Sequence, residues 1–417
     1  MKNLKPTKYI VIIADGMADR PVKELDGDTP LKKANKPHMD KLASNGIIGK
    51  IRTIPHGFHP GSDIANMNIL GYNPAKYYSG RAPLEAISMN INLRKNDVAF
   101  RCNLVTIKYN KEKTRAIMED YSGGHITTEE AKELIKTINE NLSTKSINFY
   151  PGVSYRHIMI WSSGPLDVEC TPPHDITGKE ISDYLPVGKG ENILRELMLK
   201  STGILECHPI NRERVRSGKK PANSIWLWGQ GKKVSMPTFK EKYNLDGALI
   251  SAVDLMKGLG KLVGFKVLDV PGITGYLDTN YANKAKYALK ALEEFDIVYI
   301  HIEAPDEAGH SGNYKNKIKA IEDIDKKVLG NLLKGLNKFP HFRILLLPDH
   351  ATPVSVKTHT EEPVPFVIYD NRIKIKTSKI KFDESITEMN NLICFEDGYR
   401  LMDFFINTDK KGEIYPN

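Results

Sequence analysis

The stretch YIVIIADG at residues 9–16 is an uninterrupted apolar run that ends in an aspartate and a glycine. Such a run is typical of a strand that is buried on both faces of a parallel sheet. Three later runs have the same form and also end in polar or glycine-rich sequence: Ser224–Trp228, Ile297–Ile302 and Ile344–Leu347. Because ligands of open α/β sheets bind at the carboxyl ends of the strands, we expect the functional site at these four ends.

Helical segments lie between the apolar runs. The predicted helices are Pro37–Asn45, Ala248–Leu259, Asn283–Glu294 and Tyr314–Leu336. The last of them has isoleucine, valine and leucine at helical spacing, which indicates one face packed on a core. The alternation of strands and helices predicts an α/β fold with a doubly wound, mostly parallel sheet.

The region from residue 95 to residue 222 has a different pattern. Its predicted strands are Phe100–Ile107, Arg115–Glu119 and Arg156–Ser162, and its predicted helices are Thr127–Leu142 and Gly190–Ser201. A chain of 417 residues is also long for a single core. We therefore predict an inserted α+β domain at residues 95–222 and a core domain made of residues 1–94 and 223–417.

The charge balance favours anionic partners. Lys and Arg number 60 against 51 Asp and Glu, a formal excess of +9. This excess suits phosphorylated metabolites or nucleic acid, but the basic clusters lack the interleaved aromatic residues of a single-strand groove. We therefore expect a small-molecule substrate and no nucleic acid. The sequence says nothing about the oligomeric state.

The cysteines and the first residues both indicate a cytoplasmic protein. Cys102, Cys170, Cys207 and Cys394 lie far apart and form no C-x-x-C pair, which argues against a zinc ribbon or a disulfide framework. The apolar run at residues 9–14 is too short for a signal peptide or a membrane span. We expect no membrane association.

Acidic and imidazole residues follow the predicted strands. Carboxylate oxygens and neutral imidazoles suit Zn²⁺, Mn²⁺ and similar ions. Alone, each residue also fits a turn, a loop or a cap, but six of ligand type beside predicted strand ends favour metal binding. Two metals about 3.5–4 Å apart would use all six and would clamp an in-line displacement at phosphorus. The six residues are Asp15, Asp306, His310, Asp349, His350 and His359.

Ser62 is the candidate nucleophile. It follows Gly61 and precedes a short helical stretch in HPGSDIANMNILG, so its simplest reading is a helix N-cap. A serine at a helix N-terminus can also bind a metal through Oγ, which lowers the pKa of its hydroxyl and makes it nucleophilic. A helix N-terminus receives phosphate well. We expect Ser62 to attack a phosphate ester.

Together these motifs resemble the alkaline phosphatase superfamily. The resemblance rests on Asp15, Ser62, APDEAGH (304–310), PDH (348–350) and THTEEPVPF (358–366). Within the superfamily the chain resembles the archaeal type of cofactor-independent phosphoglycerate mutases. The motifs that carry this narrower resemblance are NMNILG (66–71), SGRAPLEA (79–86), FRCNLVT (100–106), PPHDITG (172–178) and PANSIWLWGQG (221–231).

The resemblance implies a role for each predicted ligand. One metal would be held by Asp15, Ser62, Asp349 and His350, and the other by Asp306, His310 and His359. Ser62 would take the phosphoryl group from 3-phosphoglycerate as a phosphoserine and return it to the other hydroxyl of the retained glycerate. No bisphosphoglycerate would be needed. The metals could be Mn²⁺, Zn²⁺, Co²⁺ or Mg²⁺, since such ligands do not select among them.

The inserted domain would then bind the substrate. Arginines suit this task because a guanidinium binds a carboxylate or phosphate through two parallel hydrogen bonds. His125 and Asp175 could serve as acid or base for the exchanging hydroxyls. The predicted substrate-binding residues are Arg101, His125, Arg156, His174, Asp175 and Arg214.

Two alternatives keep the same ligands. A metal-dependent phosphatase or phosphodiesterase of the superfamily would let water remove the phosphoryl group from Ser62. A non-catalytic protein that binds phosphorylated metabolites would keep only the fold, although such degeneration should delete ligands and none is missing. The serine motif GSDIAN differs from the GNSEVGH of the bacterial mutases, which supports the archaeal branch.

Overall fold

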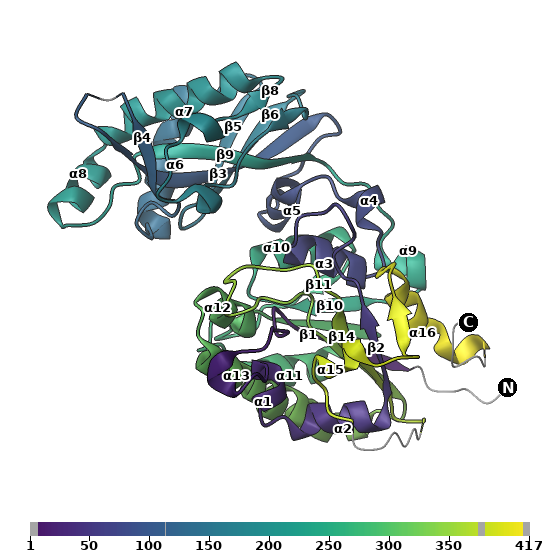
Figure 1. Ribbon diagram of the computed structural model, residues 1–417. Helices are drawn as coiled ribbons and strands as arrows, with labels where there is room; N and C mark the ends of the chain where they lie inside the picture. Colours follow the sequence, from purple (N-terminus) through teal and green to yellow (C-terminus); the bar gives the residue numbers. More distant parts are fainter. Residues whose placement is uncertain (1–6, 113, 374–379, 412–417) are drawn as a thin grey trace. The chain divides into compact units, whose positions relative to one another are not determined.

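A computed structural model describes residues 7–112, 114–373 and 380–411, and the chain divides into two compact units (Figure 1). Unit 1 comprises Met1–Tyr78 and Met236–Asn417, and unit 2 is Ser79–Ser235. Unit 2 is wider at both ends than the predicted insertion at 95–222. The reason is that helix α5 (Arg81–Ser88) packs on strands β3 (Asp97–Tyr109) and β9 (Ser224–Lys232), which both belong to the sheet of unit 2.

Unit 1 is built on a mixed sheet of mostly parallel strands. β1 lies between β12 and β13 and is parallel to both. Over the described residues, β14 is the strand that runs against the others, since it is antiparallel to both β13 and β2. The order across the sheet is β11 (Lys266–Val267), β10 (Gly247–Ile250), β12 (Ile297–Ile302), β1 (Lys8–Ala14), β13 (Phe342–Leu347), β14 (Val364–Asp370), β2 (Ile47–Ile51) and β15 (Ile393–Phe395).

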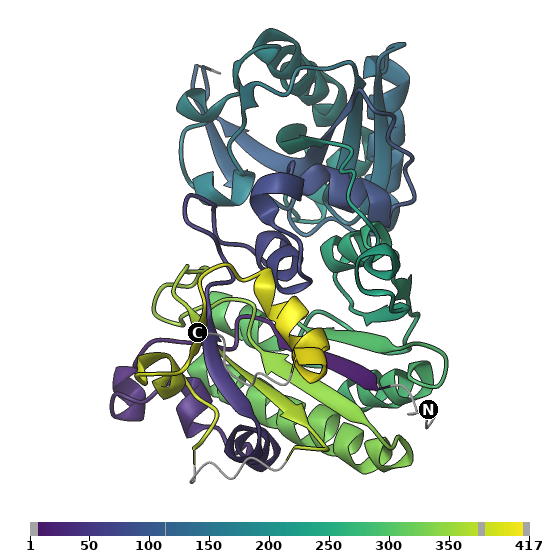
Figure 2. The same cartoon turned by 90° about the vertical axis from the view of Figure 1, so that its right-hand side faces the viewer.

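Helices cover both faces of this sheet, as the views in Figures 1 and 2 show. Alternate residues of β1 divide between the two layers, because successive side chains of a strand point to opposite faces. Ile10, Ile12 and Ala14 pack in one core with the helices of the first layer. On the other face, Tyr9 packs edge-on against Phe405 of α16. The first layer contains α1 (Pro30–Lys33), α2 (Pro37–Asn45), α11 (Tyr281–Ala291), α13 (Tyr314–Asp323) and α14 (Gly330–Gly335), and the second α3 (Ser62–Ile69), α10 (Asp254–Leu262) and α16 (Arg400–Lys411).

The predicted doubly wound α/β fold is therefore confirmed for unit 1. The helix predicted at Ala248–Leu259 was wrong in its first part, where residues 247–250 form β10 and pair with β12, and the helix begins only at Asp254. The helix predicted at Tyr314–Leu336 is interrupted by a π-helical turn at Ile324–Leu329. The residues that complete unit 1 form α4 (Pro74–Tyr77), α9 (Phe239–Tyr243), α12 (Ala304–His310) and α15 (Ser385–Glu388), with 3₁₀ turns at Lys23–Leu25 and Leu336–Lys338.

Unit 2 is an antiparallel sheet with helices packed on it. β3 pairs with β4, β6 and β9, and β5 pairs with β6. Thr127 caps α6 with a capping box, in which its hydroxyl accepts a hydrogen bond from the Glu130 backbone amide. The helix therefore begins one residue after the predicted start. The other elements are β4 (Ala116–Asp120), α6 (Thr128–Leu142), β5 (Ile147–Val153), β6 (Arg156–Ser162), β7 (Val168–Glu169), β8 (Val187–Gly188), α7 (Glu191–Glu206) and α8 (Pro209–Arg216), with 3₁₀ turns at Pro173–Ile176 and Ser182–Tyr184.

The assignment of Ser224–Trp228 to the parallel sheet was wrong. This run is part of β9, which pairs antiparallel with β3 inside unit 2. Residues 224–228 are all buried, so an unbroken apolar run does not distinguish this strand from a central strand of a parallel sheet.

Candidate functional site

The candidate site lies at the carboxyl ends of three neighbouring parallel strands in unit 1. Asp15 follows β1, and Asp349 and His350 follow β13 after Pro348. β12 is followed at once by α12, which carries Asp306 and His310 on successive turns. Because β12, β1 and β13 are adjacent and parallel, their ends meet at the same edge of the sheet. The fold thus brings five of the predicted ligands together.

Gly16 lets the first of these ends approach the others closely. Its φ is +61°, and a Cβ at this position would lie 2.6 Å from Oδ1 of Asp306 and 2.7 Å from the Asp306 Cα. Its amide nitrogen donates a hydrogen bond of 3.1 Å to Oδ1 of Asp349. A side chain at residue 16 would therefore both strain the backbone and push two predicted ligands apart.

Asp15, Asp349 and His350 form the first cluster of ligand atoms. One ligand atom from each lies within 4.8 Å of the other two, and all three residues are buried. The Ser62 hydroxyl lies beside them at the first residue of α3, with Oγ 3.1 Å from Nε2 of His350. The predicted nucleophile is thus next to the predicted ligands.

Asp306, His350 and His359 form the second cluster, so His350 belongs to both. Nε2 of His310 lies 3.1 Å from Oδ2 of Asp306 and 3.0 Å from Nε2 of His359. The resemblance placed His350 with the first metal, whereas the geometry sets it between the clusters. All seven residues predicted from the sequence converge here, and their role as ligands stays a prediction.

The electrostatics of the site reflect carboxylates buried side by side. Burial, followed by the charge of Asp349, raises the pKa of Asp15 well above its usual range. Burial also acts to raise the pKa of Asp306, but hydrogen bonds and charges from His310 and His359 outweigh it and lower that pKa. Burial lowers the pKa of His350 to about 4, so its imidazole is neutral at pH 7 and has a lone pair available for a metal.

The residues present fit divalent cations. Oδ1 of Asp15 is buried and has no hydrogen-bond partner within the described part of the chain. The facing Nε2 atoms of His310 and His359 also point at one place next to Asp306. Carboxylate oxygens and imidazole nitrogens gathered at one place are the donor set that Zn²⁺ and Mn²⁺ take.

Sequence reasoning missed four residues that touch the site. His301 is buried in β12, with Nε2 3.1 Å from Oδ2 of Asp15. Asn66 lies one turn after Ser62 and donates 2.8 Å hydrogen bonds to the Ser62 carbonyl and to Oδ2 of Asp349. Polar residues inside a fully buried strand or helix were the available signal. The other two are Tyr299, which donates to Oδ1 of Asn66, and Thr352, which donates to Oδ1 of Asp306.

Unit 2 contains the predicted substrate-binding residues. Arg101 is buried, pairs with Glu85 at 2.9 Å and lies with Cζ 4.1 Å from the centre of the Trp228 ring. The His174 ring packs edge-on against the Trp228 ring, and their centroids are 5.3 Å apart. Asp175 lies 3.6 Å from the exposed His174 ring. Arg101, His174 and Asp175 are therefore neighbours.

The other three predicted substrate-binding residues differ in their exposure. Arg156 is exposed beside Tyr155, and His125 is exposed in the left-handed backbone region at φ 50°. Arg214 is buried, and its nitrogens donate to Glu130 and to the carbonyls of Gly123, Gly124 and Lys220. Its guanidinium thus holds the turn that precedes His125, and its role in substrate binding stays a prediction.

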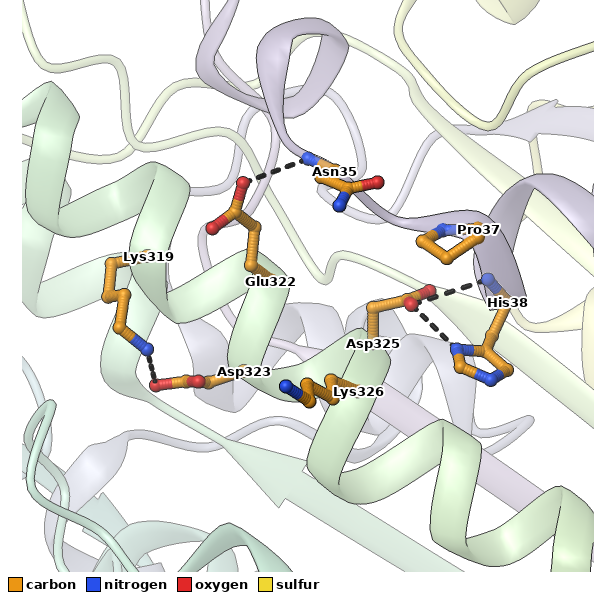
Figure 3. A pocket seen from close by; sticks show the side chains of 8 residues that line it. All are labelled: Asn35, Pro37, His38, Lys319, Glu322, Asp323, Asp325 and Lys326. Carbon is orange, nitrogen blue, oxygen red and sulfur yellow. Dashed lines mark hydrogen bonds and ion pairs between the residues drawn. The ribbon is translucent and has the colours of Figure 1, made fainter.

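A separate pocket lies on the first helix layer of unit 1. It has a volume of about 450 Å³ and is lined by residues of α2, α13 and the π-helical turn (Figure 3). Asp325 there accepts hydrogen bonds from the His38 ring and from the backbone at the start of α2. None of the predicted site residues lines this pocket. Its His38–Asp325 contact joins α2 to the π-helical turn, whereas the Lys319–Asp323 pair lies within α13. No helix in the described part of the chain is long and apolar enough to cross a membrane.

Comparisons with known proteins find similarity to one family of enzymes. The family described as 2,3-bisphosphoglycerate-independent phosphoglycerate mutase matches residues 43–211. A probable enzyme of this name from Geobacter sulfurreducens is 50% identical over 400 residues, which cover 96% of this chain and 100% of that protein. The enzyme from Methanosarcina acetivorans is 54% identical over 364 residues, 87% of this chain and 90% of that protein. Among solved structures, the cofactor-independent phosphoglycerate mutase of Thermoplasma acidophilum aligns with a TM-score of 0.63 and 28% identity, over 96% of this chain and 99% of that one.

Proposed function

Because this chain belongs to the family of 2,3-bisphosphoglycerate-independent phosphoglycerate mutases, we propose that its reaction passes through a phosphoserine at Ser62. It is an isomerase that acts on a small phosphorylated substrate. The observation that carries the proposal is the position of the Ser62 hydroxyl, 3.1 Å from the imidazole that belongs to both clusters.

The two clusters are the proposed sites of two divalent cations. Such cations, when bound, neutralise the phosphoryl oxygens and lower the pKa of a coordinated hydroxyl. Their identity is open among Mn²⁺, Zn²⁺, Co²⁺ and Mg²⁺. We assign Asp15, Ser62, Asp349 and His350 to one ion, and Asp306, His310 and His359 to the other.

The chain's own residues supply the nucleophile. Ser62 begins α3, so the free backbone N–H groups of the first turn are available to phosphoryl oxygens. Ser62 Oγ, having lost its proton, forms a bond to phosphorus while the bond to the 3-oxygen of the glycerate breaks, and that oxygen gains a proton. In the return step the 2-oxygen loses a proton and takes the phosphoryl group from Ser62. The net reaction converts 3-phosphoglycerate into 2-phosphoglycerate.

Unit 2 is proposed to hold the glycerate between these steps. Arg101 suits the carboxylate of the substrate, because stacking on Trp228 and pairing with Glu85 fix the plane of its guanidinium. Arg156 is a further candidate for the substrate's negative charge. His125 and Asp175 are exposed groups that can exchange protons with the two hydroxyls, and His174 neighbours Asp175.

The reaction indicates the pathway and the compartment in which the protein works. Interconversion of these two phosphoglycerates is a step of glycolysis and gluconeogenesis, and we propose that the protein works in the cytoplasm. The free thiols of Cys102, Cys170, Cys207 and Cys394 suit a reducing compartment.

A single assay tests the function. The purified protein is incubated with Mn²⁺ and 3-phosphoglycerate, without bisphosphoglycerate, and the products are followed by phosphorus NMR. We expect 2-phosphoglycerate to accumulate to equilibrium with little free phosphate. If free phosphate were the main product, the hydrolase alternative would hold, and if neither product formed, the chain would be a binding protein.

A further inference from the structure

The side chain of Thr352 links the two clusters. It is fully buried two residues after His350. Its hydroxyl donates a hydrogen bond to Oδ1 of Asp306 and lies 3.2 Å from Nδ1 of His350. A carboxylate only accepts hydrogen bonds and a hydroxyl has one hydrogen, so the bond between Thr352 and His350 must be donated by the imidazole. Thr352 thereby places the His350 proton on Nδ1 and leaves Nε2 bare.

The bare Nε2 is the atom that faces the reacting groups. It lies 3.1 Å from Ser62 Oγ and 3.5 Å from Oδ1 of Asp15. A hydrogen on Nε2 would point at these groups and would block a cation. The Thr352 hydroxyl therefore acts on both clusters, through Asp306 in one and through His350 in both.

The backbone of Thr352 is fixed by two hydrogen bonds. Its carbonyl accepts a 2.9 Å hydrogen bond from Nζ of Lys317, and its amide donates to the Ala18 carbonyl at 3.2 Å. The side chain is enclosed by two glycines, since a Cβ at Gly16 would lie 2.5 Å from Oγ1 and one at Gly309 would lie 2.8 Å from Cγ2. These contacts leave the hydroxyl little freedom to turn away.

Lys317 is the anchor of this arrangement. Its ammonium group is fully buried and donates to three acceptors, the carbonyls of Ala18 and Thr352 and Oδ2 of Asp19, at 3.0, 2.9 and 2.7 Å. An ammonium has three hydrogens, so each is used. Lys317 thus joins the segment after β1, the segment after β13 and α13, and it has no donor left for a substrate.

We propose that Thr352 is a positioning residue that sets the tautomer of His350 and so couples the two cation sites. The inference rests on the proposed function, because it presupposes that the clusters bind cations. Outer groups that orient a metal-binding histidine commonly change metal affinity by about 10- to 100-fold when they are removed.

The test compares Thr352→Val with Thr352→Ser. Valine keeps the shape and removes the hydroxyl, whereas serine keeps the hydroxyl. Metal-stripped proteins are titrated with Mn²⁺ by calorimetry, and circular dichroism confirms that each variant is folded. We expect two ions per wild-type chain, at least about tenfold weaker binding in Thr352→Val, and affinity within about threefold of wild type in Thr352→Ser.

Wild-type affinity for two ions in Thr352→Val would overturn the inference, as would equal weakening in both variants. If Thr352→Val does not fold, Thr352→Ala replaces it under the same criteria. Failure of the proposed function would be visible in the wild-type protein itself, which would then bind no pair of Mn²⁺ ions or form no 2-phosphoglycerate.

Discussion

The hydroxyl oxygen of Ser62 lies 3.1 Å from Nε2 of His350, although 287 residues separate them in the chain. We predict that Ser62→Ala lowers mutase turnover by at least about 10⁴-fold, because no other group replaces the nucleophile. The fold should persist, since Ser62 is only half-buried. Turnover is measured in the coupled assay with Mn²⁺. The control is Ser44→Ala, which removes a hydroxyl bonded to the Ile380 carbonyl and should leave turnover unchanged.

His310 and His359 face each other with their Nε2 atoms 3.0 Å apart. Removal of divalent metal should abolish activity and also lower the melting temperature, because cations that bind only the folded chain stabilise it. Ions at 100 times their dissociation constant contribute about 2.7 kcal/mol of stability. Melting with and without a chelator measures the effect. His359→Asn should lose one Mn²⁺ per chain, whereas the exposed His56, replaced by Asn, should keep both.

Arg101 is held in place by Glu85 and Trp228. Arg101→Met should raise the KM for 3-phosphoglycerate by about 10- to 100-fold, since a charged hydrogen bond contributes about 1.5–3 kcal/mol. It should also increase release of free phosphate, because glycerate that escapes leaves the phosphoserine open to water. Arg195→Met is the matched control, since Arg195 bonds to the Pro186 carbonyl and pairs with Glu191 on α7. An unchanged KM in Arg101→Met would remove Arg101 from the substrate site.

Arg214 is a predicted substrate-binding residue that also has contacts within unit 2. Its pair with Glu130 is 2.7 Å long and its side chain is buried. Arg214→Met should destabilise unit 2 by about 1–3 kcal/mol, because the turn carbonyls of Gly123 and Gly124 lose their donor. The loss is measured by urea unfolding. A raised KM with unchanged stability would instead support the predicted role of Arg214 in substrate binding.

Glu384 gives unit 1 a pH-dependent stability. It accepts hydrogen bonds from the Asp19 amide and the Thr29 hydroxyl, and burial raises its pKa from 4.5 to about 7. Since the folded pKa is the higher one, the folded state binds the proton more tightly. The stabilisation is complete below pH 4.5 and is lost as the pH rises through 7.

Glu384→Gln removes this titration. Between pH 5 and pH 8, the unfolding free energy of the wild type should fall relative to that of Glu384→Gln by at most about 3 kcal/mol. Urea unfolding of the metal-free proteins measures it, because metal binding has a pH dependence of its own. Parallel pH profiles of the two proteins would show that Glu384 does not titrate in this range.

Much of the core fold could be predicted from residue patterns. The apolar runs at 9–14 and 297–302 are strands because continuous β-branched sequence is stable only between two covering layers, and their polar ends mark the site. Ser224–Trp228 has the same pattern and lies in the other unit. Such a run predicts only that the strand is buried on both faces. Which strands it pairs with depends on residues that are distant in the chain.

The sequence by itself determined the chemistry of the candidate site, and the tertiary structure decided the relationships within it. Asp15, Ser62, Asp306 and His350 could be selected because their side chains carry donors that metals and phosphoryl groups require. The position of His350 in both clusters and the hydroxyl bridge of Thr352 depend on the register of β1 and β13. Arg214 likewise has the side chain of an anion-binding residue, and only the structure shows that its guanidinium bonds to backbone carbonyls. Residue type fixes what a group can bind, whereas packing across the chain fixes what it meets.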